Sequence, residues 1–273
     1  MSLDVPMPVT PTHGLNTVRA SIRSCSVGLA KRNIRGIRRL PSAFLPSLVM
    51  PVFQAIAFSG SFFAITRIPG FPTDRSINWF MPLAILMGSG FAGVGVGLAA
   101  IRDIETGFYD RLRLSPAPRS SLITGPLLGA LGRSLVVTSL VTVVGVALGA
   151  RWNDGVISIV PLYIAGFGIA AAGTGWGLGL AFRFRDMRAA ALMQLTLFIG
   201  LFLSEAQTPL SVMEGWLHTV ARINPFTNVL RLAREGWVGE VSWDDTWGGV
   251  AALVVISALT LWFARRGLDK LEA

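Results

Sequence analysis

The residues best suited to chemistry form one charged block between two apolar segments. This block, within residues 101–119, holds Arg102, Asp103, Glu105, Asp110, Arg111 and Arg113. Guanidinium and carboxylate groups at this density form ion pairs and charge-assisted hydrogen bonds. We therefore expect a recognition surface here, with an ordinary solvated loop as the alternative.

The chain lacks the residue sets that enzymes and metal sites use. It has one cysteine, Cys25, and two histidines, His13 and His218, so neither a disulfide nor a structural zinc site is expected. Lys31 is the only lysine outside the C-terminal tail, and no phosphate-binding loop of the form G-x-x-x-x-G-K-[ST] contains it. We expect no catalytic residue, no metal and no cofactor bound by this chain, so we do not expect an enzyme that acts alone.

The composition indicates the environment in which these residues work. Of the 273 residues, 52% are hydrophobic and only 14% are charged, against about 25% charged in a soluble domain. The net charge of +9 accompanies apolar runs, so it indicates membrane topology rather than nucleic-acid binding. The sequence predicts an all-α, multi-pass membrane protein.

Six apolar segments approach the roughly 20 residues that a helix needs to cross a bilayer. They are 43–65, 79–101, 122–150, 156–182, 189–204 and 246–264. They divide the chain into an N-terminal arm (1–40) and a six-span domain (41–273), with a loop at 102–121 and a long segment at 205–245. The fifth segment is the shortest.

The distribution of Lys and Arg predicts the orientation. Seven lie in the arm 1–40, four in loop 102–121, three in loop 183–188 and three in the C-terminal tail, against six in the three loops of the other side. Under the positive-inside rule both termini and loop 102–121 are cytoplasmic. We expect a protein of the plasma membrane.

The arm ends in a stretch with the pattern of an amphipathic helix. Val27, Ala30, Ile34 and Ile37 recur at helical spacing, and the remaining faces carry Lys31, Arg32, Arg35, Arg38 and Arg39. Such a helix is typical of the membrane interface, beside anionic head groups. A plain positive anchor is the simpler interpretation.

The charged block has helical spacing too. Ile101, Ile104, Phe108 and Leu112 fall on one face, and Pro116 and Pro118 end the pattern. The sequence therefore predicts a short helix over 102–115. It would lie on the cytoplasmic surface or dock into a groove of another protein.

The long segment 205–245 has two apolar stripes separated by Asn224-Pro225. Two half-helices that re-enter the outer leaflet fit this pattern, and a surface cap is the alternative. Glu205, at the outer end of the fifth span, is a candidate for lining an exit route. Arg133 is the one ionisable residue well inside a predicted span, so it is either a contact on the transport path or a structural residue near the interface.

Glycines four residues apart recur in the spans and predict close helix packing. The pairs are Gly93/Gly97, Gly125/Gly129, Gly145/Gly149, Gly173/Gly177 and Gly175/Gly179.

Two motifs resemble those of the membrane subunits of type-2 ATP-binding-cassette exporters, in particular the daunorubicin-resistance permeases of actinobacteria. The first consists of Glu105, Gly107, the run Arg111-Leu112-Arg113, and Pro116. The second is Asn224-Pro225, then Arg231 or Arg234, then Gly236 or Gly239. The resemblance covers nearly the whole chain.

The resemblance implies that loop 102–121 is a coupling helix which docks into a groove of a separate ATPase subunit. The implied coupling residues are Arg102, Asp103, Glu105, Gly107, Phe108, Arg111, Arg113 and Pro116. It also implies an interface helix that contributes to this contact and re-entrant outer helices. Two permease copies, or two related permeases, would pair above two ATPase subunits, which bind ATP and Mg.

We therefore expect the permease subunit of an ATP-driven exporter that moves a hydrophobic drug-like or lipid-like compound outward by alternating access. One alternative is a structural or regulatory membrane subunit that recruits an ATPase without forming the path. A secondary carrier is disfavoured because no Asp or Glu lies in the middle of a predicted span.

Overall fold

The structure is a computed structural model that describes residues 21–39, 41–115 and 117–272, with side chains described except at 36–48, 113 and 272. Every regular element in these ranges is helical. The elements are α1 (Ile22–Arg39), α2 (Pro41–Ser61), η1 (Phe63–Arg67), α3 (Ser76–Glu105), α4 (Phe108–Arg113), α5 (Ser121–Ala147), η2 (Gly155–Ser158), α6 (Ile159–Phe184), α7 (Ala189–Phe202), α8 (Gly215–Ile223), α9 (Pro225–Arg234) and α10 (Trp243–Glu272).

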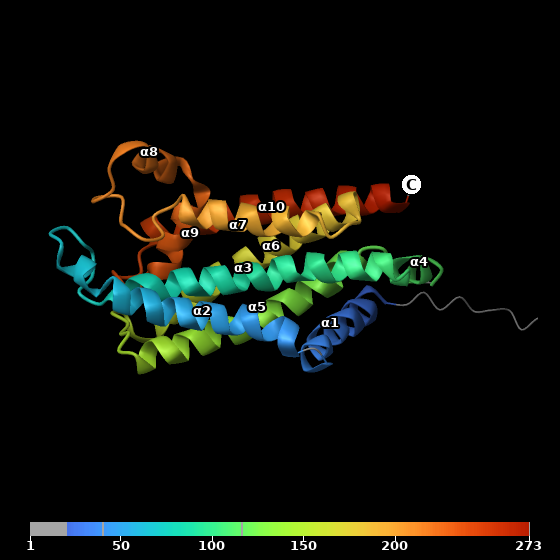
Figure 1. Cartoon of the computed structure of the whole chain (residues 1–273), viewed down its shortest axis with the longest axis horizontal. Helices are drawn as coiled ribbons and strands as arrows, with labels where there is room; N and C mark the ends of the chain where they lie inside the picture. Colours follow the sequence, from blue (N-terminus) through green and yellow to red (C-terminus); the bar gives the residue numbers. More distant parts are fainter. Residues whose placement is uncertain (1–20, 40, 116, 273) are drawn as a thin grey trace, which may run out of the picture.

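The helices form one elongated bundle (Figure 1). Helices α2, α3, α5, α6, α7 and α10 run along its long axis. The start of α1, helix α4 and the end of α10 lie at one end, which we call the α4 end. Helices η1, α8 and α9 lie at the opposite end, which we call the α8 end.

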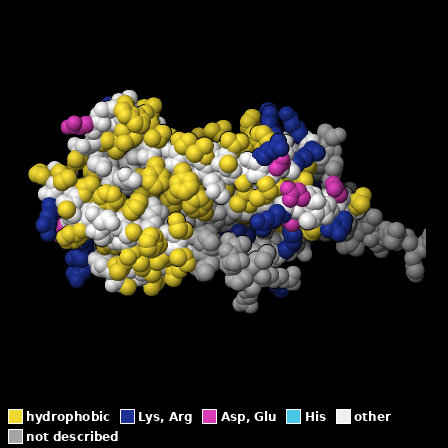
Figure 2. Space-filling model, in the orientation of Figure 1, with side chains coloured by type: hydrophobic (Ala, Val, Ile, Leu, Met, Phe, Trp, Pro, Cys, Tyr) yellow, Lys and Arg dark blue, Asp and Glu magenta, His cyan; other side chains and the backbone are white. Residues whose placement is uncertain are grey.

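Four helices are long and apolar enough to cross a membrane: Ser76–Glu105, Ser121–Ala147, Gly155–Phe184 and Trp243–Leu271. Four of the six predicted spans are thus confirmed as spanning candidates. The other two predicted spans are also helical, but their described apolar parts, Val49–Ser61 and Ala189–Phe202, are shorter. In Figure 2 hydrophobic side chains dominate the flank of the bundle and most charged side chains gather toward its two ends, which is the surface that a bilayer requires.

Helix α3 lies at the centre of the bundle, in contact with α2, α5, α6 and α7. Its close approach to α6 depends on the predicted glycine pairs. A Cβ on Gly97 would lie 2.5 Å from the carbonyl carbon of Gly177, and a Cβ on Gly173 would lie 2.9 Å from the carbonyl oxygen of Gly90. Real Cβ atoms do not fit at these distances, so the prediction of close packing at Gly93/Gly97 and Gly173/Gly177 is confirmed.

Helix α6 uses its other face in the same way against α10. A Cβ on Gly175 would lie 2.5 Å from the carbonyl carbon of Thr260, and one on Gly179 would meet the ring of Phe263. Because α6 contacts both α3 and α10 extensively, it connects the buried centre of the bundle to the C-terminal helix.

Candidate functional site

The charged block lies at the α4 end, where α3 finishes and α4 begins. The predicted single helix over 102–115 is wrong. Helix α3 continues through Glu105 and is followed by Thr106 and Gly107, which adopts a left-handed conformation with φ of +67°. The Thr106 amide donates to the Arg102 carbonyl at 3.0 Å and the Gly107 amide to the Ile104 carbonyl at 3.0 Å. These bonds terminate α3, and the chain changes direction before the six residues of α4.

The apolar stripe of this block packs inward, which corrects the expectation that it faces a partner. Ile101 and Tyr109 are buried, and Ile104, Phe108 and Leu112 pack against the same core. The Tyr109 ring meets the Phe182 ring of α6 edge-on, with centroids 5.6 Å apart. Burial raises the pKa of the Tyr109 phenol well above its usual range, so this side chain stays neutral at physiological pH.

We call the turn at Thr106-Gly107 between α3 and α4 the elbow. Its outward face carries side chains that are exposed. Glu105, Asp110 and Arg111 are exposed, and the Leu114 side chain is 90% exposed. Leu114 was not among the residues singled out from the sequence. Its position one residue after α4 breaks the 3-4-4 spacing, so no periodic pattern points to it.

The structure describes the other expected coupling residues to different extents. Pro116 is outside the described residues, and the side chain of Arg113 is not described. Arg102 is exposed on the last turns of α3. Gly107 is required by its left-handed backbone conformation rather than by space, since a Cβ there would meet only the Asp110 carboxylate at 3.9 Å.

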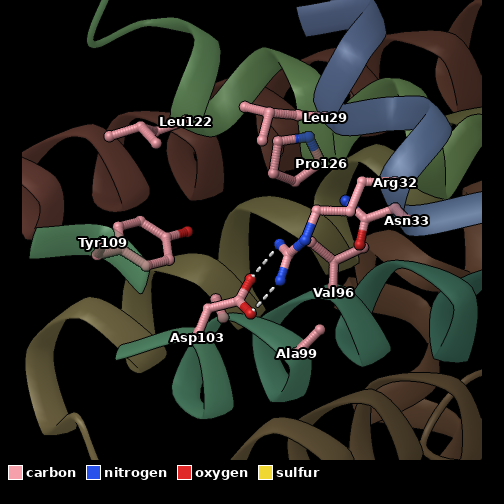
Figure 3. Close-up of a pocket in the computed structure, with 10 residues that line it drawn as sticks. Leu29, Arg32, Asn33, Val96, Ala99, Asp103, Tyr109, Leu122 and Pro126 are labelled. Carbon is pink, nitrogen blue, oxygen red and sulfur yellow. Dashed lines mark hydrogen bonds and ion pairs between the residues drawn. The ribbon is translucent and has the colours of Figure 1, made fainter. Parts of the chain in front are cut away.

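Arg32 of α1 and Asp103 of α3 form a paired interaction at this elbow (Figure 3). Arg32 donates through Nη1 to Oδ2 at 2.7 Å and through Nη2 to Oδ1 at 2.5 Å. The guanidinium carbon also lies 4.0 Å from the centroid of the Phe108 ring. Its hydrogen bonds to Asp103 raise the pKa of Arg32 above its usual value. Both groups are therefore engaged within the chain in this structure.

A cavity of about 20 Å³ opens beside this pair, between α1, α3, α4 and α5. Arg32, Asp103, Tyr109, Leu122 and Pro126 are among its lining residues (Figure 3). This volume suits a single water molecule and is far below the ~300 Å³ of a small-ligand pocket. This cavity is therefore too small to enclose a drug-sized substrate.

Helix α1 is fixed against α5 by the predicted pair Gly125/Gly129. A Cβ on Gly125 would lie 2.6 Å from the Leu29 Cβ, and a Cβ on Gly129 would lie 3.0 Å from the Asn33 Cβ. Val27 and Ile34, which belong to the predicted apolar face, are 39% and 44% exposed. The contact with α5 therefore leaves these apolar residues outward, as a helix at a lipid interface requires.

The structure describes the side chains of only some of the other cations predicted for the interface helix. Lys31 and Arg35 are exposed, and the side chains of Arg38 and Arg39 lie outside those described. Arg133 of α5 lies against α1, where its Nη2 donates to the Asn33 carbonyl at 3.4 Å. Its buried Nε has no hydrogen-bond partner among the described residues.

Glu205 lies in a buried polar cluster at the α8 end. Its Oε1 is 3.3 Å from Arg231 Nε and 3.7 Å from Arg234 Nη1. Arg234 also donates to the carbonyls of Trp79, Glu205 and Ala206 at 2.8–3.2 Å, and its guanidinium carbon lies 3.4 Å from the centroid of the Trp79 ring. The charge of Glu205 is therefore balanced within the chain. The sequence offered Arg234 only as one of two arginines of a motif and did not point to Trp79.

Asn224 and Pro225 join α7, α8 and α9. The Asn224 side chain accepts from the Phe226 amide at 3.0 Å, which caps α9, and Pro225 is the first residue of that helix. The same side chain donates to the carbonyls of Gly200 and Leu203 at 2.8 and 2.9 Å. One asparagine thus satisfies backbone groups at the end of α7 and at the start of α9.

No group of three or more His, Cys, Asp or Glu side chains that could hold a metal ion is present in the part of the chain that the structure describes.

Comparison with known proteins identifies the family of this chain. A family model described as ABC-2 type transporter matches residues 27–237. The chain is 23% identical over 237 residues to the daunorubicin resistance ABC transporter permease protein DrrB1 of Streptomyces coeruleorubidus, covering 85% of this chain and 81% of that protein.

The chain is also similar to proteins named putative transport permease ycf38. The identity to the protein of Porphyra purpurea is 24% over 243 residues, covering 85% of this chain and 82% of that protein. The identity to the protein of Cyanophora paradoxa is 26% over 215 residues, covering 76% and 71%. Because the family match covers more than half of the chain, this chain belongs to the ABC-2 type transporter family. The resemblance inferred from the residues is confirmed.

Proposed function

We propose that this chain, as a member of the ABC-2 type transporter family, is the permease subunit of an exporter powered by a separate ABC ATPase. Membership in the family implies such a partner. The chain itself has no phosphate-binding loop, so the free energy of ATP hydrolysis must reach it through a contact with the partner.

The α4 end is the proposed contact, and the exposure of Leu114 is the observation that supports it best. Leu114 is 90% exposed, and Glu105, Asp110 and Arg111 near it in the sequence are also exposed, so this end presents an apolar side chain together with charged ones. This is the usual composition of a small docking site. In the proposal this surface enters a groove of the ATPase, and the inward stripe of Ile104, Phe108 and Leu112 carries its movement into the bundle.

The positive-inside distribution of Lys and Arg supports a cytoplasmic location for the α4 end and for both termini. In the proposal the protein resides in a bacterial plasma membrane and its chain crosses six times. Helix α7, with 14 residues, extends about 21 Å at 1.5 Å per residue, so it needs the following segment to reach the far surface. Helices α8 and α9 then form the re-entrant element, with Asn224-Pro225 at its turn.

The proposed substrate is a hydrophobic drug-like or lipid-like compound, moved by alternating access at the interface of two permease copies. The name of the Streptomyces relative, a daunorubicin resistance permease, supports a drug-like class. Arg133 and Glu205 remain candidates for the path, although the ion pairs of Glu205 favour a structural role. The alternative, a membrane subunit that recruits an ATPase without forming a path, shares the same docking surface.

Reconstitution in liposomes distinguishes the two functions. The chain is combined with an ABC ATPase that co-purifies with it, and the ATP-dependent movement of daunorubicin and of a fluorescent phospholipid is measured. An exporter moves at least one probe only when ATP and Mg are present. A complex that assembles and hydrolyses ATP but moves neither probe supports the recruiting subunit instead.

Charge reversal at the docking surface tests the site. Arg111→Glu is expected to reduce both ATPase binding and transport, because the reversed charge opposes the partner's groove. Arg23→Glu, an exposed position on α1, serves as the control. Assembly and transport that withstand Arg111→Glu combined with Arg113→Glu would show that the α4 end is not the contact.

A further inference from the structure

Arg32 differs from the other described cations of its helix. Lys31, Arg32 and Arg35 are all exposed, but the guanidinium of Arg32 turns toward α3 and meets Asp103 through two parallel hydrogen bonds (Figure 3). The side chains of the pair are 47% and 19% exposed. Because the pair is bidentate, it fixes the relative orientation of its two groups as well as contributing energy.

The pair connects both sides of the elbow to α1. Asp103 belongs to α3, before Gly107, and Phe108 belongs to α4, after it. Arg32 donates hydrogen bonds to Asp103. Its guanidinium carbon also lies 4.0 Å from the centroid of the Phe108 ring. One side chain of α1 therefore spans the break, and a planar guanidinium fixes orientation better than a lysine could.

Helix α4 needs such a contact to keep its direction. It has six residues, which is too short for an independently stable helix, and the glycine before it permits several backbone conformations. Tyr109 anchors its inner side against Phe182. Phe108 and Leu112 pack against the same core, and the Arg32 contact with Phe108 adds a restraint from the side of α1.

Helix α1 provides a firm support for this restraint because it is packed on α5. Gly125 and Gly129 admit Leu29 and Asn33 at close range, and the Ser26 and Thr124 hydroxyls are 2.6 Å apart. A force applied to α4 is thus transmitted through Arg32 to α1 and from there to α5.

We propose that Arg32 is a positioning residue that holds α4 in one orientation on α1, so that α1, α4 and α5 move as one body. Asp103 is accordingly part of this internal joint and does not contact the ATPase. The orientation stands on the geometry alone. The consequence for coupling rests on the proposed function.

The orientation is tested on the chain alone in lipid nanodiscs. Spin labels are placed at Gly28→Cys, where a Cβ meets nothing within 4 Å, and at the exposed Asp110→Cys, in a Cys25→Ser background. Electron paramagnetic resonance then measures the distance between α1 and α4. We expect one narrow distance in the labelled parent, loss of that narrow distance in Arg32→Gln, and its retention in Arg23→Gln, which removes the same charge from the same helix.

Charge exchange separates pairing from a general effect of charge. In Arg32→Asp combined with Asp103→Arg the ion pair can re-form, and we expect most of the narrow distance to return, whereas each single change loses it. A narrow distance that persists in Arg32→Gln overturns the inference, whatever the outcome of the transport experiments.

The consequence for coupling is measured in the reconstituted complex. In Arg32→Gln we expect retained ATPase binding and an unchanged thermal unfolding midpoint, but about tenfold less substrate moved per ATP hydrolysed. A merely structural role would lower stability and binding together. If the parent itself neither binds the ATPase nor moves substrate, the proposed function fails while the spin-label result still decides the orientation.

Discussion

At the scale of single residues, Arg234 makes the densest set of polar contacts in the described part of the α8 end. It is 3% exposed, donates to three carbonyls and lies beside the Glu205 carboxylate. A buried charge is tolerated when its hydrogen bonds are complete, and removing one partner leaves the others unsatisfied. Arg234 therefore holds the segment after α7 against α3 and α9.

Arg234→Met is expected to destabilise the chain by about 3–5 kcal/mol, because Glu205 and three carbonyls lose a buried partner. Arg231→Met is the matched control. Its side chain is 44% exposed, so its loss is expected to cost about 1 kcal/mol or less. Thermal unfolding in detergent measures both, and equal shifts for the two variants would contradict this assignment.

Gly236 and Gly239 are two candidate glycines for the same motif position, and the structure separates them. Gly236 has φ of +73°, and a Cβ there would clash with Ser158, whereas Gly239 has nothing within 4 Å. Gly236→Ala is expected to lower the free energy of unfolding by about 1–3 kcal/mol, because both its backbone conformation and its space exclude a side chain. Gly239→Ala is expected to be nearly neutral.

Chemical denaturation in detergent compares the two alanine variants. The assignment of Gly236 fails if Gly239→Ala is the more destabilising change.

At the residue scale, the sequence singled out Arg32 and Asp103 but did not predict that they bind each other. It marked Asp103 and Arg32, but it assigned the first to an ATPase contact and the second to the membrane interface. In the structure they bind each other across 71 positions of the chain. Residue spacing reports only neighbours along one helix, so a contact between helices of this kind is invisible to it. Leu114 was missed for the related reason that it follows no period.

At the scale of elements, the helices follow from apolar length, but the break at Gly107 does not. Ile101, Ile104, Phe108 and Leu112 have the spacing of a continuous helix, and this pattern persists across the turn because α4 packs on the same core. The Asn224-Pro225 signal did predict a helix boundary correctly, since a capping residue followed by proline has a local cause. Local signals are thus readable from sequence, whereas a bend fixed by tertiary packing is not.

The crossing of α3 and α6 offers a test at this scale. Gly97→Val is expected to prevent correct packing, because the added Cβ alone would lie 2.5 Å from Gly177 and overpacking costs about 1–3 kcal/mol or more. Gly60→Val on α2 is the control, since a Cβ there has nothing within 4 Å. Size-exclusion profiles and unfolding midpoints in detergent compare the two. A well-folded Gly97→Val protein would show that the helices cross elsewhere.

At the scale of the whole molecule, composition was sufficient to predict a helical membrane protein, and the order of motifs was sufficient for the family. Four spans are supported by length and apolarity. The count of six and the orientation stay predictions, because α7 is short and the positive-inside rule concerns charges in loops rather than packing. The bundle places α4 at the opposite end from α8, and Leu114 directly follows α4 in the chain.

Site-specific photo-crosslinking tests the central claim, docking of an ABC ATPase at the α4 end, most directly. A photoreactive amino acid replaces Leu114 in one variant. In the control it replaces Val156, which is 76% exposed and lies in η2 between α5 and α6. Each variant is co-expressed with the ABC ATPase that co-purifies with the chain and is irradiated in membranes. The account predicts a crosslink to the ATPase from position 114 and none from position 156. A crosslink from position 156 with none from position 114 would contradict it.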